Sequence, residues 1–91
     1  MRFEWDEPKN RQNRRKRGVD FEVAALVFDD PNHLSDQDRI VDGEERWQTI
    51  GLVNEILIVC HTWSDEDVIR IISARKATRR ERTRYYGHRL L

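Results

Sequence analysis

The first five residues, Met1-Arg2-Phe3-Glu4-Trp5, alternate between apolar and polar side chains. This two-residue period is typical of a β-strand. Asp6 is a residue type that caps helices, and the polar segment 7–17 follows it and stops at Gly18, a common C-terminal helix signal. The chain therefore predicts a strand followed by a helix whose surface is polar on nearly every side.

A second helix is predicted directly after Gly18. Asp20 can serve as its N-cap, and apolar residues recur at helical spacing in Phe21, Ala24, Ala25 and Phe28. The sequence Asp29-Asp30-Pro31-Asn32 breaks this helix. The next segment, 33–45, is acidic and poor in apolar residues, so it is interpreted as an irregular strand or a mobile loop with an Asp42-Gly43 turn.

Three strands are predicted in the second half of the chain, over 46–52, 56–63 and 68–73. Their short connections favour antiparallel pairing. A symmetric turn over 64–67 places Trp63 opposite Val68 and His61 opposite Arg70.

This register assigns the strand residues to two sheet faces. One face then carries Ile56, Ile58, Cys60 and Thr62 with Ile69 and Ile71, and the other carries Leu57, Val59, His61 and Trp63 with Val68, Arg70 and Ile72. Both faces are largely apolar. Helices can cover one of them, and the other is expected to receive a C-terminal helix or a partner protein.

The last predicted element is a helix. Thr78 and Glu81 have the spacing of a capping box, which opens a helix to Tyr86 with Gly87 as its stop. The chain, 1–91, is thus predicted to form a single α+β domain, because its length allows one modest core. Its antiparallel sheet carries two N-terminal helices and a short C-terminal helix, in the order βααβββα.

Charge is segregated along the chain although the formal net charge is zero. Residues 1–20 carry seven Lys and Arg against four Asp and Glu, residues 21–68 carry two against twelve, and residues 69–91 carry eight against one. The blocks can neutralise one another within the fold, but a long arginine run usually leaves several guanidinium groups in solvent. Because guanidinium groups bind phosphate bidentately, the basic segment from Arg70 to Arg89 predicts a surface for RNA phosphate.

Within this segment, the last helix supplies the outer candidates for RNA binding. The four candidates, three guanidinium groups and one tyrosine that can stack a base, are Arg79, Arg80, Arg84 and Tyr85. The alternative is a solvated arginine-rich helix that pairs with the acidic middle of the chain.

Other site chemistries find little support in the residues. The single cysteine, Cys60, lies in an apolar run and is interpreted as a buried, inert thiol. Histidine and carboxylate spacings do not fit a metal site, and nucleophile motifs and phosphate-binding glycine loops are absent, so no metal or cofactor is expected. No secretory signal or transmembrane run is visible, so the expected location is the cytoplasm, away from membranes.

Metal-free RNA cleavage needs a base for the ribose 2′-hydroxyl, a cation for the phosphorane charge and an acid for the leaving 5′-oxygen. His61 is the candidate proton carrier, since the predicted register sets it opposite Arg70; its alternative role is a hydrogen-bonded histidine at the sheet margin. The candidate catalytic set, one histidine and four cations, is Arg46, His61, Arg70, Arg75 and Lys76.

Several stretches of the chain match a known protein family. They are Phe3-Glu4-Trp5-Asp6, Gly18-Val19-Asp20-Phe21-Glu22, Ala24-Ala25-x-Val27-Phe28-x-Asp30-Pro31, Gly43-Glu44-Glu45-Arg46-Trp47, Thr49-Ile50-Gly51, His61-Thr62, Arg70-Ile71-Ile72-Ser73-Ala74-Arg75-Lys76-Ala77-Thr78 and Glu81-Arg82. With these the chain resembles the BrnT toxins, the ribonuclease half of BrnT–BrnA type II toxin–antitoxin systems.

The resemblance implies a RelE-like fold and a metal-independent endoribonuclease that inhibits translation. The implied partner is a BrnA-type antitoxin with a DNA-binding half, in a heterotetramer that represses its own operon, so DNA is contacted only through the antitoxin. The apolar second sheet face is the expected antitoxin seat. The family usually reads Lys-His-Gly where this chain has Lys16-Arg17-Gly18, and arginine cannot act as a neutral base.

Two other functions stay open at this point. One is a non-catalytic RNA- or ribosome-binding module, which the arginine at position 17 favours. The other is an interaction protein whose basic helix meets an acidic partner.

Overall fold

The computed structural model describes residues 1–89, and the side chains of residues 1–88. The elements in this part of the chain are β1 (Arg2–Glu4), α1 (Glu7–Arg17), α2 (Phe21–Ala25), the 3₁₀ helix η1 (Leu26–Asp29), β2 (Leu34–Val41), β3 (Glu44–Val53), β4 (Glu55–Asp65), β5 (Val68–Lys76) and α3 (Arg79–Arg89). The mixed α+β class is confirmed. The predicted order lacked one strand, β2.

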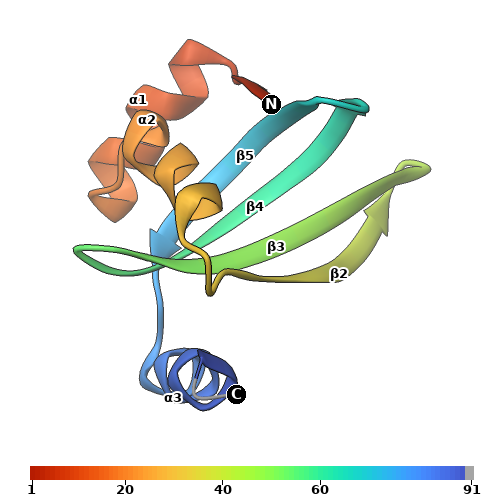
Figure 1. The fold of residues 1–91 in the computed structure, drawn as a ribbon. Coiled ribbons are helices and arrows are strands. Elements are labelled where there is room, and N and C mark those ends of the chain that lie inside the picture. The colour runs from red at the N-terminus through yellow and green to blue at the C-terminus, as the bar shows by residue number, and fades with distance from the viewer. Residues whose placement is uncertain (90–91) are drawn as a thin grey trace.

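The sheet has the strand order β1-β5-β4-β3-β2 (Figure 1). Its four long strands pair antiparallel, but β1 runs parallel to β5, with Phe3 opposite Ile69. The prediction of a purely antiparallel sheet is therefore wrong. No tight turn joins β1 to β5, because α1, α2 and three strands lie between them in the sequence, so the antiparallel geometry of a hairpin does not apply.

Of the two alternatives for segment 33–45, the irregular strand is correct and the mobile loop is wrong. β2 pairs with β3 from Leu34 opposite Ile50 to Val41 opposite Glu44, with a bulge between Gln37 and Arg39. The Asp42-Gly43 turn is confirmed: both residues have positive φ, 50° and 80°, as a two-residue hairpin turn requires. Most β2 side chains are exposed on both faces, so no apolar alternation marks the strand in the sequence.

The register of β4 and β5 differs from the predicted one. Asp65 lies opposite Val68, and irregularities near Ser64 and Ile72 set His61 opposite Ile71 and Thr62 opposite Arg70. The turn therefore closes two residues later on β4 than the symmetric turn assumed. The sequence contains no signal for either bulge, and the predicted grouping of Ile69 and Ile71 with Ile56 and Ile58 is wrong as a result.

Two separate apolar clusters lie on the two sheet faces. On one face, α1, α2 and η1 pack over residues that include Phe21, Val27, Leu57, Val59 and Ile71. On the other, α3 covers a smaller cluster of Ile50, Ile56, Ile58, Ala77 and Tyr85. Figure 1 shows α3 on the opposite side of the sheet from α1 and α2. The apolar part of the second face is thus covered by the chain's own helix and is not an open antitoxin seat.

Asp30 anchors α3 to the sheet. The Tyr85 hydroxyl donates to its carboxylate, which also accepts from the backbone N–H of Leu52 at 2.8 Å. Burial acts to raise the pKa of Asp30, but these bonds and one from the Asn32 N–H outweigh it and lower the pKa.

The helix ends follow the predictions in part. α1 has the predicted bounds and ends at Gly18, whose φ of 72° is left-handed, and Asp20 caps α2 by accepting from the Glu22 N–H. Asp6, in contrast, makes no side-chain capping bond. The Thr78–Glu81 capping box is confirmed by reciprocal bonds of 2.8 and 3.2 Å, but α3 continues through Gly87 to Arg89.

None of the helices in residues 1–89 is long and apolar enough to cross a membrane.

Candidate nucleic-acid interface

The sheet face that carries α3 is apolar beneath that helix and mostly polar on the part that the helix does not cover. Strand alternation and pairing place six mostly polar side chains on this part, which we call the polar sheet face: Arg46, Gln48, Cys60, Thr62, Arg70 and Ser73. They come from β3, β4 and β5, so three neighbouring strands contribute to one surface.

Arg46, Thr62 and Arg70 form a row across this face. Thr62 lies opposite Arg70, and Arg46 directly precedes Trp47, which pairs with His61. Nε of Arg46 and Oγ1 of Thr62 are buried and have no hydrogen-bond partner among the described residues. Buried polar atoms are nearly always hydrogen-bonded, so this row has donor capacity that the fold itself does not use.

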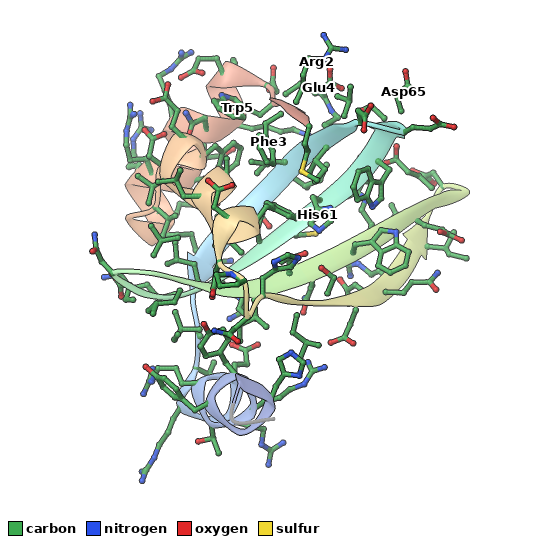
Figure 2. All side chains as sticks on the ribbon, in the orientation of Figure 1. Arg2, Phe3, Glu4, Trp5, His61 and Asp65 are labelled. Atoms are coloured by element: carbon green, nitrogen blue, oxygen red, sulfur yellow. The ribbon has the colours of Figure 1, made fainter. Side chains whose placement is uncertain are left out.

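The two arginines of the row are only loosely paired with carboxylates. Arg46 Nε lies 3.6 Å from Glu44, and an Arg70 guanidinium nitrogen lies 3.7 Å from Glu4. The Arg46 side chain is 21% exposed and that of Arg70 41%. Figure 2 shows Glu4 beside Arg2 and near Asp65, at the end of the sheet where β1 begins. Ion pairs of this length and exposure contribute little stability, so both guanidinium groups can turn toward a phosphate.

Arg75 is held much more firmly at the α3 end of the same face. It donates two hydrogen bonds to Glu81, at 2.7 and 2.9 Å. The bond from Arg75 is the main reason why the pKa of Glu81 falls to about 2, and the same bond raises the pKa of Arg75. Arg75 therefore has a structural partner already, and it binds phosphate only if Glu81 releases it.

Lys76 and His61 lie on the other side of the sheet. Lys76 pairs opposite Leu57, whose side chain belongs to the cluster under the N-terminal helices, and its ammonium group lies 3.8 Å from Glu55. His61 is 1% exposed and packs edge-on against Phe28, with ring centroids 5.0 Å apart. Figure 2 shows His61 on β4 near the middle of the sheet.

The environment of His61 keeps its ring neutral. Nε2 shares a 2.8 Å hydrogen bond with the Thr49 hydroxyl, which in turn bonds to Ser35 at 2.7 Å. Burial lowers the pKa of His61 to about 4. The ring is hydrogen-bonded as the alternative role assumed, but it lies in the interior instead of at the margin. A histidine so placed does not contact RNA bound at the polar sheet face.

The residues of α3 divide into exposed and enclosed groups. Arg79 and Arg80 are exposed, and neither has a charged partner within the described residues. Arg84 is paired with Asp36 of β2. Tyr85 is 1% exposed and its hydroxyl donates to Asp30, so its ring is enclosed and offers no face for base stacking. The side chain of Arg89 lies outside the described residues.

Cys60 is half-buried on the polar sheet face. Burial raises the pKa of its thiol, and the nearby carboxylate of Asp38 adds to the increase. The thiol is therefore protonated at neutral pH. The sequence predicted a buried thiol, and the structure shows a half-buried one. In residues 1–89, no three His, Cys, Asp or Glu side chains gather as metal ligands.

The structure thus brings Arg46 and Arg70 into one row, places Arg75 farther along the same face, and separates Lys76 and His61 onto the other face. Sequence reasoning missed Thr62 and Ser73, which lie between the arginines. Alternation along β4 from Cys60 points to Thr62, but Ser73 emerges on this face only because of the irregularity at Ile72.

Comparisons with known proteins agree on one family. The family model described as "Ribonuclease toxin, BrnT, of type II toxin-antitoxin system" matches residues 5–81. The crystal structure of the Brucella abortus ribonuclease toxin BrnT is similar, with a TM-score of 0.70 and 26% sequence identity; the alignment covers 87% of this chain and 99% of that one. A search of the curated proteins found no match.

Proposed function

Because the chain belongs to the family of BrnT ribonuclease toxins of type II toxin–antitoxin systems, we propose that it is a metal-independent endoribonuclease that inhibits translation. Its substrate is RNA, and its inhibitor is a BrnA-type antitoxin. We further propose that toxin and antitoxin assemble in the cytoplasm as a heterotetramer that contacts DNA through the antitoxin alone. A RelE-like classification of the fold is part of the same proposal.

The observation that carries the proposal is the row of Arg46, Thr62 and Arg70 on the polar sheet face. It combines two loosely paired guanidinium groups with buried polar atoms that have no partner in the described residues. Guanidinium groups stay charged at every physiological pH and match the geometry of phosphate oxygens. Such a row is suited to hold one phosphodiester over β4, between Arg46 of β3 and Arg70 of β5.

Cleavage at this row follows the chemistry of RNA itself. The ribose 2′-oxygen loses its proton to a base and attacks the adjacent phosphorus, and the bond to the 5′-oxygen breaks as that oxygen takes up a proton. The products are a 2′,3′-cyclic phosphate and a 5′-hydroxyl. Arg46 and Arg70 stabilise the charge that develops on the phosphorane oxygens. Arg75 lies five residues farther along β5 and binds a neighbouring phosphate of the strand when Glu81 releases it. The exposed Arg79 and Arg80 of α3 attract the RNA strand, with Arg84 beside them.

His61 and Lys76 are not part of the proposed cleavage site, because their side chains project to the opposite sheet face. Tyr85 is likewise a packing residue in this proposal. These three assignments change the candidate set that the sequence suggested.

The decisive experiment compares RNA cleavage by the wild-type protein and the Arg46→Gln, Arg70→Gln double variant, both in excess chelator. We expect cleavage by the wild type to persist in chelator and the double variant to lose about 100-fold or more, the typical cost of removing groups that stabilise transition-state charge. The matched control is Arg11→Gln, Arg15→Gln, which removes two exposed arginines of α1. Intact RNA after incubation with a stoichiometric excess of the folded wild-type protein would refute the enzyme.

A non-catalytic RNA- or ribosome-binding module is the second candidate. It is favoured by one observation: among the described residues, the polar sheet face contains no histidine. This module would bind RNA with a log–log salt slope of roughly −0.7 for each phosphate contacted, and it would release the RNA uncut.

A further inference from the structure

An open groove lies between α1 and the part of β5 that does not pair with β1. Its volume is about 270 Å³. Lys9, Lys16 and Arg17 line it from α1, the buried Asn13 forms part of its floor, and Ile72 and Ser73 line it from β5. Figure 1 shows α1 running beside β5.

Helix geometry explains why these cations share one groove. Lys9, Asn13 and Lys16 are spaced at i, i+4 and i+7, so they form one stripe along α1. Asn13 fixes the stripe against the sheet, because its side-chain amide bonds to both backbone groups of Ala74. The stripe therefore cannot rotate away from β5 without breaking buried hydrogen bonds.

The cations of the groove differ from those of the sheet in having no acidic partner. Every arginine of β2, β3 and β5 lies within 4.0 Å of a carboxylate. Lys9, Lys16 and Arg17 have no ion pair or side-chain hydrogen bond within the described part of the chain. The helix dipole favours cations in the last turn of α1, but Lys9 lies in its first turn, where the dipole opposes a cation. The groove therefore concentrates positive charge that the fold leaves uncompensated.

The groove is continuous with the polar sheet face. Ser73 belongs to both, since it lines the groove and lies opposite Cys60 on the face that carries Arg70 and Arg75. At about 3.3 Å per strand residue, Ser73 is roughly 7 Å from the backbone position of Arg75 and 10 Å from that of Arg70. A nucleic-acid strand lying on the face can thus pass over the β5 edge into the groove.

We propose that this groove is a second phosphate subsite for the RNA strand, occupied by a phosphate next to the one held by Arg46 and Arg70. The inference rests on the proposed binding of RNA at the polar sheet face. Lys9, Lys16 and Arg17 neutralise the phosphate, and Ile72 gives the ribose an apolar contact. The groove is slightly smaller than a typical small-molecule site of about 300 Å³ or more, which suits a sugar-phosphate unit rather than a longer folded segment.

The test measures binding of 2′-O-methyl RNA, which lacks the nucleophile for cleavage, to a Lys9→Gln, Lys16→Gln, Arg17→Gln variant. All three side chains are exposed, so we expect the fold to be retained, as circular dichroism and the unfolding midpoint will check. The control removes three exposed arginines of α1 that lie outside the groove: Arg11→Gln, Arg14→Gln and Arg15→Gln. Both variants lose the same charge, so a difference between them reports position.

Oligonucleotides of two lengths distinguish binding in the groove from binding at the polar sheet face. For a hexanucleotide, we expect the groove variant to reduce the log–log salt slope by about 0.7 per phosphate lost and the control to change it less. For a dinucleotide, which has a single internucleotide phosphate, we expect wild type and groove variant to bind alike. Equal losses in the groove and control variants would overturn the proposal, because they would indicate general attraction alone.

Two further outcomes are distinguishable. If the groove variant keeps full hexanucleotide affinity but loses binding of an oligoglutamate peptide, the groove is a site for an acidic protein and the RNA proposal is overturned. If the groove variant weakens hexanucleotide binding while the wild type fails to cut unmodified RNA, the subsite stands and only the enzymatic proposal fails.

Discussion

The side-chain amide of Asn13 completes the hydrogen bonds of Ala74 at the edge of the sheet. Nδ2 donates to the Ala74 carbonyl at 2.9 Å, and Oδ1 accepts from the Ala74 N–H at 3.2 Å. β1 pairs with β5 only as far as Arg70, so Asn13 takes the place of a neighbouring strand farther along. The same Nδ2 also donates to the Val19 carbonyl at 2.9 Å, which joins α1, the start of α2 and β5.

Replacement of Asn13 by alanine should therefore be costly. It leaves two carbonyls and one N–H buried without partners, at about 1 kcal/mol or more each, so we expect the free energy of unfolding to fall by about 2–4 kcal/mol. Urea unfolding of Asn13→Ala measures this directly. The neighbouring exposed Gln12→Ala is the control, with an expected change within about 0.5 kcal/mol. Equal stabilities of the two variants would contradict the role of the amide.

The pH dependence of stability should report the burial of His61. Its pKa is about 4 in the folded protein, below the usual 6.5, because the ring is buried. The unfolded chain thus binds more protons between these values, so the stabilising contribution is complete above pH 6.5 and is lost as pH falls toward 4. From pH 7 to pH 4 the loss is roughly 3 kcal/mol. His61→Gln should flatten this part of the profile, and NMR titration of the ring should give the low pKa; a value near 6.5 would place the ring in solvent.

Glu81 should also lose its stabilising contribution as pH falls, but here the fold favours the charged form of the group, whereas it favours the neutral form of His61. Its pKa is about 2 because Arg75 donates to it, so its contribution is present above pH 4.5 and is lost as pH falls through about 2. At pH 7 we expect Glu81→Ala to lower the free energy of unfolding by about 2 kcal/mol, since both a helix cap and a charge-assisted pair are removed. The difference from wild type should narrow below pH 4.5. Glu66→Ala in the β4–β5 turn removes the same charge without a cap and should change stability little.

Gly51 should tolerate no side chain, whereas Gly87 should. A Cβ at Gly51 would lie 2.7 Å from Val27 Cγ1 and 3.0 Å from the Val27 carbonyl oxygen, where η1 packs on β3. Gly51→Ala should therefore lower the free energy of unfolding by about 1–3 kcal/mol. A Cβ at Gly87 would meet nothing within 4 Å inside α3, so Gly87→Ala should stabilise the protein by up to about 1 kcal/mol. Thermal unfolding compares the two, and a destabilised Gly87→Ala would mean that the helix ends before this residue.

The sequence predicts those elements whose signals are local. The bounds of α1, the Asp20 cap, the Asp42-Gly43 turn and the Thr78–Glu81 box each depend on a few neighbouring residues, and each appears in the structure. The way in which α1 attaches was not predictable from apolar periodicity. Its buried positions are Asn10 and Asn13, which hold the helix by hydrogen bonds, so a helix that is polar all round still has an inner face.

The candidate site was less predictable than these elements, because it depends on the register between β4 and β5. The irregularities in the β4–β5 pair move Arg70 to the opposite face from His61, which stays with Leu57 and Val59 on the face that the N-terminal helices cover. Arg70 and Arg75 share a face although five positions separate them, and Lys76 follows Arg75 onto the other face. Neither bulge is marked by glycine or proline, so composition alone could not divide the basic residues between the two faces.

The polar character of β2 has a consequence for how molecules of this protein meet one another. β2 is the last strand of the sheet, and its outer backbone edge would pair readily with a strand of a second molecule. Asp36, Asp38 and Arg39 place charges along that edge, and the irregularity between Gln37 and Arg39 distorts it. Charges and a bulge on an open edge oppose strand addition and aggregation. The acidic residues of β2 leave no apolar alternation by which the sequence could reveal the strand. The same residues oppose polymerisation of the folded protein through its sheet edge.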